Sequence, residues 1–132
     1  MPTKDQHLRQ FKRNRDFAVS IDRKFIEWQV TAIFYTALQA VDAVIAKLGK
    51  QVADHSSRME LMQSDATFVT IRKAYKELFD LSLSARYDAI AGDFFPDDFL
   101  HVNDLADQLL KPIDNWLEVT LGIKVQQIRL DV

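Results

Sequence analysis

The chain has 132 residues, of which 48% are hydrophobic, and a formal net charge of −2. A domain of this length buries roughly two-thirds of the surface that its unfolded chain exposes, so a single domain over residues 1–132 is expected. The absence of cysteine excludes disulfides, thiolate catalysis and Cys-ligated metal sites. No apolar run approaches the roughly 20 residues of a membrane span, and residues 1–15 lack the apolar stretch of a signal peptide. A cytoplasmic protein without membrane contact is therefore expected.

Charge is distributed unevenly along the chain. Residues 1–24 carry a net charge of +4, residues 25–87 are balanced, and residues 88–118 carry −7. A basic segment of this kind can contact nucleic acid. The alternative is that the basic and acidic parts pack near each other or face water. This alternative is favoured, because a dedicated duplex-DNA binder has a clear basic excess that this chain lacks.

Apolar residues recur at steps of three and four along the first half of the chain, which predicts helices. The first helix is expected over residues 5–22 and the second over residues 25–50, with Gly49 as its stop. The second segment is apolar nearly all round, so it should be the most buried helix. Its expected core residues are Trp28, Phe34, Leu38, Val41 and Ile45.

A shorter helical segment and a long one follow. Residues 54–58 predict a loop that leads into one or two helical turns through residue 63. Ser64 or Asp65 can cap a long helix that reaches Asp88. The expected inner face of this helix consists of Phe68, Ile71, Tyr75, Leu78, Ser82 and Ala85.

The last part of the chain predicts one more helix and a tail. After a loop marked by Gly92 and Pro96, Asp97 and Asp98 favour a helix start. Pro112 lacks a backbone N–H, which predicts a kink or break. Residues 128–132 alternate apolar and charged, as in a short strand or an extended C-terminal tail. Four long helical segments joined by short loops predict an all-α fold, an antiparallel bundle of four to five helices.

A narrow polar line crosses the otherwise apolar second helix. Tyr35, Gln39 and Asp42 lie four and three residues apart and therefore share one face. A carboxylate there requires a partner or water. Arg86, at the border of the next buried face, is the expected partner, because a guanidinium pairs bidentately with a carboxylate or a phosphate. An Asp42–Arg86 ion pair, or separate pairings of the two residues, would hold two helices in register. The alternative is a shared polar cleft that receives a phosphate or a base.

Histidines give the remaining candidates for chemistry. His55 and Arg58 form an i, i+3 pair, and a histidine can act as a general base or a phosphate ligand, although a lone loop histidine is more often structural. His7 and His101 have no supporting neighbours. No HExxH motif, Glu-x-x-His pair, glycine-rich phosphate loop or nucleophile elbow occurs, so no metal and no cofactor is expected.

Three segments, taken in order, resemble the HEPN superfamily, the "higher eukaryotes and prokaryotes nucleotide-binding" domains. They read WQVTAIFYTALQAVDA (residues 28–43), DHSSR (residues 54–58) and YKELFDLSLSARY (residues 75–87), after a basic first helix that carries Asn14. The resemblance covers roughly residues 8–90 and implies a bundle of four or five helices that usually forms a homodimer. It also implies RNA cleavage, nucleotide binding, or pairing with a nucleotidyltransferase-type protein in toxin–antitoxin or defence modules.

The ribonuclease members of this superfamily carry an arginine followed, after four to six residues, by a histidine. Arg86 matches the arginine, but residues 87–93 contain no histidine, and Gln39 stands where related sequences often place one. The sequence therefore predicts a non-catalytic domain that binds a nucleotide, RNA or a protein partner. Its expected site residues are Arg86, Tyr87, Arg58, His55, Asp42 and Gln39.

Two alternatives stay open at this point. One is a divergent metal-independent ribonuclease, in which His55 is the acid–base group and Arg86 stabilises phosphate charge. The other is a purely structural interaction protein. Geometry distinguishes these two alternatives, because catalysis requires His55 and Arg86 to converge on one phosphate-sized space.

Overall fold

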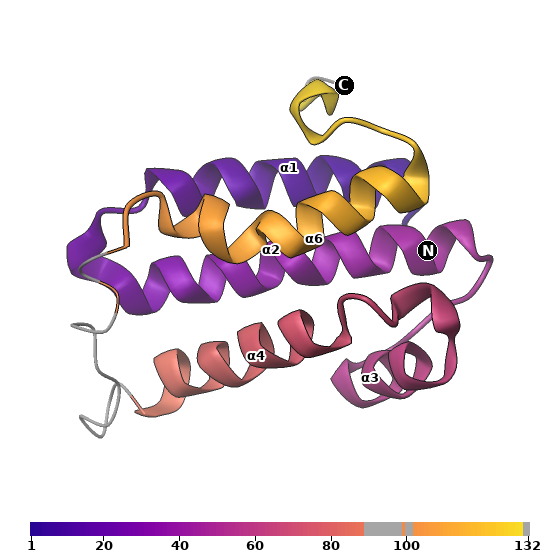
Figure 1. The fold of residues 1–132 in the computed structure, drawn as a ribbon, viewed down its shortest axis with the longest axis horizontal. Helices are drawn as coiled ribbons and strands as arrows, with labels where there is room; N and C mark the ends of the chain where they lie inside the picture. Colours follow the sequence, from indigo (N-terminus) through magenta and orange to yellow (C-terminus); the bar gives the residue numbers. More distant parts are fainter. Residues whose placement is uncertain (89–98, 100–101, 131–132) are drawn as a thin grey trace.

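The computed structural model describes residues 1–88, 99 and 102–130. Over these residues it is an all-α bundle without strands, which confirms the predicted fold class (Figure 1). Its α-helices are α1 (Lys4–Ser20), α2 (Ile26–Lys47), α3 (His55–Ser64), α4 (Arg72–Leu83) and α6 (Leu105–Leu121). Short 3-10 turns are η1 (Arg23–Phe25), η2 (Ala66–Phe68) and η5 (Val125–Gln127), and the π-helical turn η3 (Ser84–Asp88) continues α4.

Helix α2 is the centre of the bundle, because α1, α4 and α6 all pack against it (Figure 1). Phe34, Leu38, Val41 and Ile45 are buried, as predicted. The prediction for Trp28 is wrong, because its side chain is 62% exposed. The reason is helical periodicity: residue 28 lies seven positions before residue 35, and therefore on the face of the polar line rather than on a buried one.

Local sequence sets the ends of α2 and α3. The N–H groups of Gly49 (φ 73°) and Lys50 donate to the carbonyls of Ala46 and Ile45 at 3.0 and 3.1 Å, which is a Schellman ending and confirms the stop at Gly49. Helix α3 begins at His55, so the loop predicted over residues 54–58 is wrong. Asp54 and Ser57 form a capping box there, with the Ser57 N–H donating to Oδ1 of Asp54 at 2.8 Å.

The long helix predicted from residue 64 or 65 is divided in two. Asp65 caps only the 3-10 turn η2, through a 2.9 Å bond from the Thr67 N–H, and α4 begins at Arg72. The predicted inner face is confirmed, since all six of its residues are buried. They are Phe68, Ile71, Tyr75, Leu78, Ser82 and Ala85.

Helix α6 runs from Leu105 to Leu121 with Pro112 inside it, so the predicted break is wrong. Pro112 is exposed, and its missing N–H costs one hydrogen bond while Leu110 and Ile113 stay fully buried beside it. After η5, Ile128 has extended dihedral angles (φ −68°, ψ 127°) and residues 128–130 form no strand, so the tail prediction holds and the strand prediction does not. The helix start predicted at Asp97 and Asp98, the loop at Gly92 and Pro96, and His101 lie outside the described residues.

The basic start of the chain packs against its acidic second half. Arg15 on α1 donates to Asp107 at 2.7 Å and to Asp114 at 2.8 Å, both on α6. Arg23 donates to the backbone carbonyls of Phe99 and Val102. Burial raises the pKa of Asp114 even though Arg15 is paired with it. Part of the uneven charge is therefore compensated inside the bundle, as the favoured alternative expected.

One helical stretch among the described residues, Arg23–Lys47, is long and apolar enough to cross a membrane by length and composition alone. Its most apolar window is 72% buried inside the bundle, as is usual for the core helix of a soluble protein.

Candidate functional site

The polar line of α2 forms the base of the candidate site. Tyr35, Gln39 and Asp42 are each half-buried and lie between α1 on one side and α3, α4 and η3 on the other. Each meets a side chain from a neighbouring element: Arg86 reaches Tyr35, His7 reaches Gln39 and Arg58 reaches Asp42. The structure thus joins Asp42, Arg58 and His55 in one group and Arg86 and Tyr87 in a second, while the predicted site residue Gln39 contacts His7 of α1 instead.

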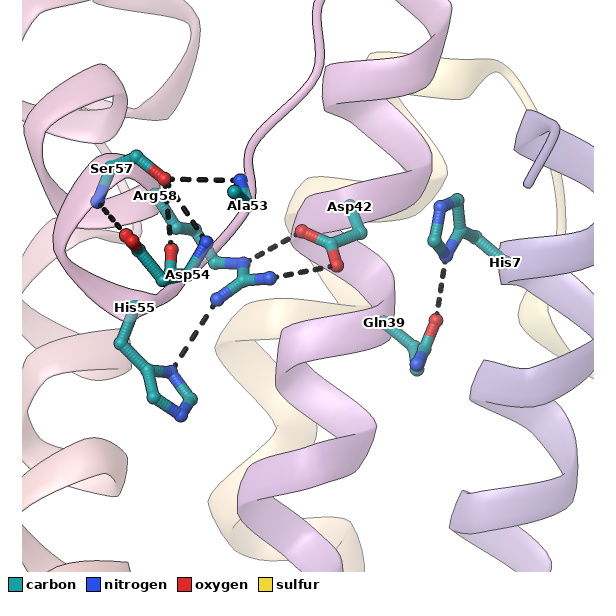
Figure 2. Close-up of polar contacts among 8 residues, drawn as sticks. All are labelled: His7, Gln39, Asp42, Ala53, Asp54, His55, Ser57 and Arg58. Atoms are coloured by element: carbon teal, nitrogen blue, oxygen red, sulfur yellow. Dashed lines mark hydrogen bonds and ion pairs between the residues drawn. The ribbon is translucent and has the colours of Figure 1, made fainter. Parts of the chain in front are cut away.

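The partner of Asp42 is Arg58, not Arg86, so the predicted Asp42–Arg86 ion pair is wrong. Nε and Nη2 of Arg58 donate to Oδ1 and Oδ2 of Asp42 at 2.7 and 3.0 Å (Figure 2). The side chains are only 9% and 12% exposed. The capping box at Asp54 starts α3 so that Arg58 lies in its first turn, directly over α2. The pair satisfies the carboxylate and fixes α3 on the bundle.

Arg86 is left without a carboxylate among the described residues. Its Nη1 donates to the Tyr35 hydroxyl at 3.2 Å, and its Nε and Nη2 donate to the carbonyl and hydroxyl of Ser82 at 3.3 and 3.4 Å. These contacts are long, and three of them leave two of the five guanidinium N–H groups unused. The guanidinium also lies 5.6 Å from the Tyr35 ring centroid and 5.5 Å from that of Tyr87.

The π-helical turn η3 carries both Arg86 and Tyr87. Turns of this kind are rare and occur frequently at functional sites. The Tyr87 side chain is 63% exposed, whereas Tyr35 is half-buried beneath the guanidinium. The Arg86 cation is therefore held over the ring of Tyr35, and the solvent-exposed ring of Tyr87 lies next to it.

His55 lies on the same side of the bundle, packed against the rings of Phe34 and Phe79 at 6.0 and 5.5 Å. Burial lowers its pKa, and the nearby Arg58 and Arg86 cations lower the pKa further. Nδ1 of His55 is 3.4 Å from Nη1 of Arg58. Since arginine only donates, Nδ1 accepts, and the neutral ring carries its proton on Nε2. His55 can thus donate to an anion through Nε2, but that nitrogen has no lone pair for a general base.

His7 has a partner that the sequence did not indicate. Its Nδ1 is 2.7 Å from Oε1 of Gln39 (Figure 2). Asn14, further along α1, donates to the Tyr35 carbonyl at 3.5 Å, and Gln10 donates to Asn14 at 2.7 Å. A hollow of about 550 Å³ opens beside this row, lined by Met1, Pro2, Gln6, His7, Gln10 and Gln39. The spacing of residues 7, 10 and 14 on one helix face is the signal that identifies them.

No family model, no curated protein and no solved structure matches the chain.

Proposed function

We propose that this chain is a HEPN-like, non-catalytic domain that binds the phosphate groups of a nucleotide or of RNA through Arg86. The observation that carries the proposal is the state of this guanidinium, which is half-buried, has unused N–H donors and has no acidic partner among the described residues. Such a group attracts an anion, and a phosphate matches its planar fork. The exposed ring of Tyr87 next to it provides a surface on which a base can stack.

The proposal includes the partners that the resemblance implies, namely a second copy of the chain and a nucleotidyltransferase-type protein, in the cytoplasm. Phe17, Phe25 and Trp28 support the homodimer, because these exposed aromatic side chains lie around the turn between α1 and α2, at one end of the bundle. Large exposed aromatic side chains near each other are typical of interaction surfaces.

One observation favours the second candidate, a metal-independent ribonuclease. His55 packs on the Phe34 ring next to Tyr35, whose hydroxyl accepts from Arg86, and the charge of Arg86 lowers the pKa of His55. The contact between His55 Nδ1 and Arg58 opposes this reading, because it leaves the neutral ring with a donor where a base needs a lone pair.

Binding of a short single-stranded oligoribonucleotide, followed by fluorescence anisotropy at two salt concentrations, tests the proposal. We expect saturable binding that weakens as salt rises, because cation–phosphate contacts release counterions, and we expect the RNA to be recovered intact. Cleavage of the RNA that the His55→Ala variant abolishes would favour the ribonuclease instead. No binding of oligoribonucleotides or nucleotides at low salt would contradict both functions.

A further inference from the structure

The amide side chains beside α1 form a second, unassigned site. The hollow of about 550 Å³ has the volume of a small-ligand pocket. Besides Met1 and Pro2, its lining among the described residues consists of three glutamines and one histidine, with no acidic or basic side chain other than the imidazole. The side chains of this hollow therefore offer a ligand mainly hydrogen bonds.

The hydrogen bonds among residues 1–88, 99 and 102–130 leave a defined set of groups of the hollow unused. Oε1 of Gln39 accepts from His7, which leaves the Gln39 amide N–H₂ as a donor and Nε2 of His7 as an acceptor in the neutral ring. The amide nitrogen of Gln10 donates to Asn14, which leaves its oxygen as an acceptor. The oxygen of Gln6 accepts from the Thr3 N–H, which leaves its amide N–H₂ as a donor.

We infer that this hollow binds a nucleobase by its edge. Free donors on Gln39 and Gln6 and free acceptors on His7 and Gln10 line the same hollow, and a base edge likewise presents donors and acceptors. Figure 2 shows the amide nitrogen of Gln39 on the side away from His7, where no side chain of the described residues uses it.

The position of the hollow connects it with Arg86 and deepens the proposed function. Tyr35, which holds Arg86, and Gln39, which lines the hollow, are four residues apart on α2, slightly more than one helical turn or about 6 Å along the axis. A nucleotide whose phosphate contacts Arg86 meets Gln39 when its base extends along α2. The inference rests on the proposed function for the phosphate contact, while the base contact stands on its own geometry.

The test compares ligands with and without a base. Ribose 5-phosphate, the four ribonucleoside 5′-monophosphates and the four nucleosides are titrated by calorimetry into the wild-type chain and its variants. We expect at least one monophosphate to bind about tenfold more tightly than ribose 5-phosphate. The neutral substitution Gln39→Met should remove this difference and leave ribose 5-phosphate binding unchanged. Gln63→Met, on an exposed position of α3, is the matched control and should change neither.

The exposed Gln10→Ala variant keeps the test decisive if Gln39→Met does not fold, because it removes one acceptor of the hollow and should also reduce the preference. Equal binding of ribose 5-phosphate and all four monophosphates, or a base preference that survives Gln39→Met and Gln10→Ala, would overturn the inference. Phosphate binding that Arg86→Ala leaves intact would overturn the proposed function instead. If the Arg86→Ala variant still binds nucleosides and the Gln39→Met variant does not, the result would support the base site independently of the phosphate contact at Arg86.

Discussion

Asp42 and Arg58 form a bidentate ion pair that joins the central helix α2 to the first turn of α3, with N–O distances of 2.7 and 3.0 Å. Arg58 therefore binds the Asp42 carboxylate, for which the sequence analysis expected Arg86 as the partner. The ion pair thus divides the polar face of α2 into a closed structural contact at Asp42 and an open cation at Arg86.

Replacement of Arg58 by Ala should destabilise the fold strongly. The substitution leaves a nearly buried carboxylate without its partner, which typically costs about 3–5 kcal/mol. Urea denaturation of the variant measures the free energy of unfolding. Lys76→Ala, which breaks the exposed Lys76–Asp80 pair, is the control and should cost less than about 1 kcal/mol. Equal losses in the two variants would show that the Asp42–Arg58 pair is not a structural contact.

Leu38 and Trp28 should respond in opposite ways to truncation, although both lie on α2. Leu38→Ala removes a buried side chain and leaves a cavity, at a cost of roughly 2–5 kcal/mol. Trp28→Ala removes a largely exposed ring, so the free energy of unfolding of the monomer should change by less than about 1 kcal/mol. The same urea titrations test both variants. A loss below about 1 kcal/mol for Leu38→Ala would show that this face is not core.

The sequence was sufficient for the helices whose apolar pattern has one clear face. The inner face from Phe68 to Ala85 and the stop at Gly49 could be predicted because periodicity and glycine dihedrals are local properties. Trp28 could not be placed in the same way, because a helix that is apolar nearly all round does not show which residues face water. The polar line through Tyr35 and Gln39 carried that information, since it extends back to residue 28.

The sequence was sufficient to predict which residues belong to the candidate site, but not which of them contact each other. Spacing along α2 identified Gln39 and Asp42 as one face, but the partner of Asp42 depends on where α3 crosses α2. That crossing follows from the capping box at Asp54, which turns the expected loop into helix and brings Arg58 over the carboxylate. The contact between His7 and Gln39 likewise depends on how the antiparallel helices α1 and α2 align.

The ionisation of His55 should report on Arg86. Burial and the two neighbouring cations lower the pKa of His55 below its ordinary value of 6.5, so folding disfavours the protonated ring. Its contribution to stability is therefore complete above about pH 6.5 and is lost as the pH falls from there through the folded-state pKa. In an NMR titration, Arg86→Ala should raise the pKa of His55. Arg13→Ala, at an exposed position, should leave the pKa of His55 unchanged. An identical His55 pKa in the two variants would show that the charge of Arg86 does not act on His55.

The oligomeric state should depend on Trp28. We expect light scattering to give twice the chain mass of 15.3 kDa for the wild type, and the chain mass itself for Trp28→Glu, because a charge at this exposed aromatic surface opposes association. Val119→Glu, at a still more exposed position on α6 (85% against 62% for Trp28), is the control and should remain a dimer. A wild-type particle of single-chain mass over a wide concentration range would contradict the homodimer.

Arg86→Ala shows whether Arg86 contacts phosphate, when the melting temperature and the binding of one single-stranded oligoribonucleotide are measured on the same sample. Because Arg86 makes only long contacts to neutral acceptors within the described part of the chain, we predict that the variant loses binding by tenfold or more while its melting temperature stays within a few degrees of the wild type. Arg13→Ala, with an exposed cation on α1, should retain binding within about twofold. Unchanged binding in Arg86→Ala, at a melting temperature equal to that of the wild type, would contradict the assignment of Arg86 as the phosphate contact.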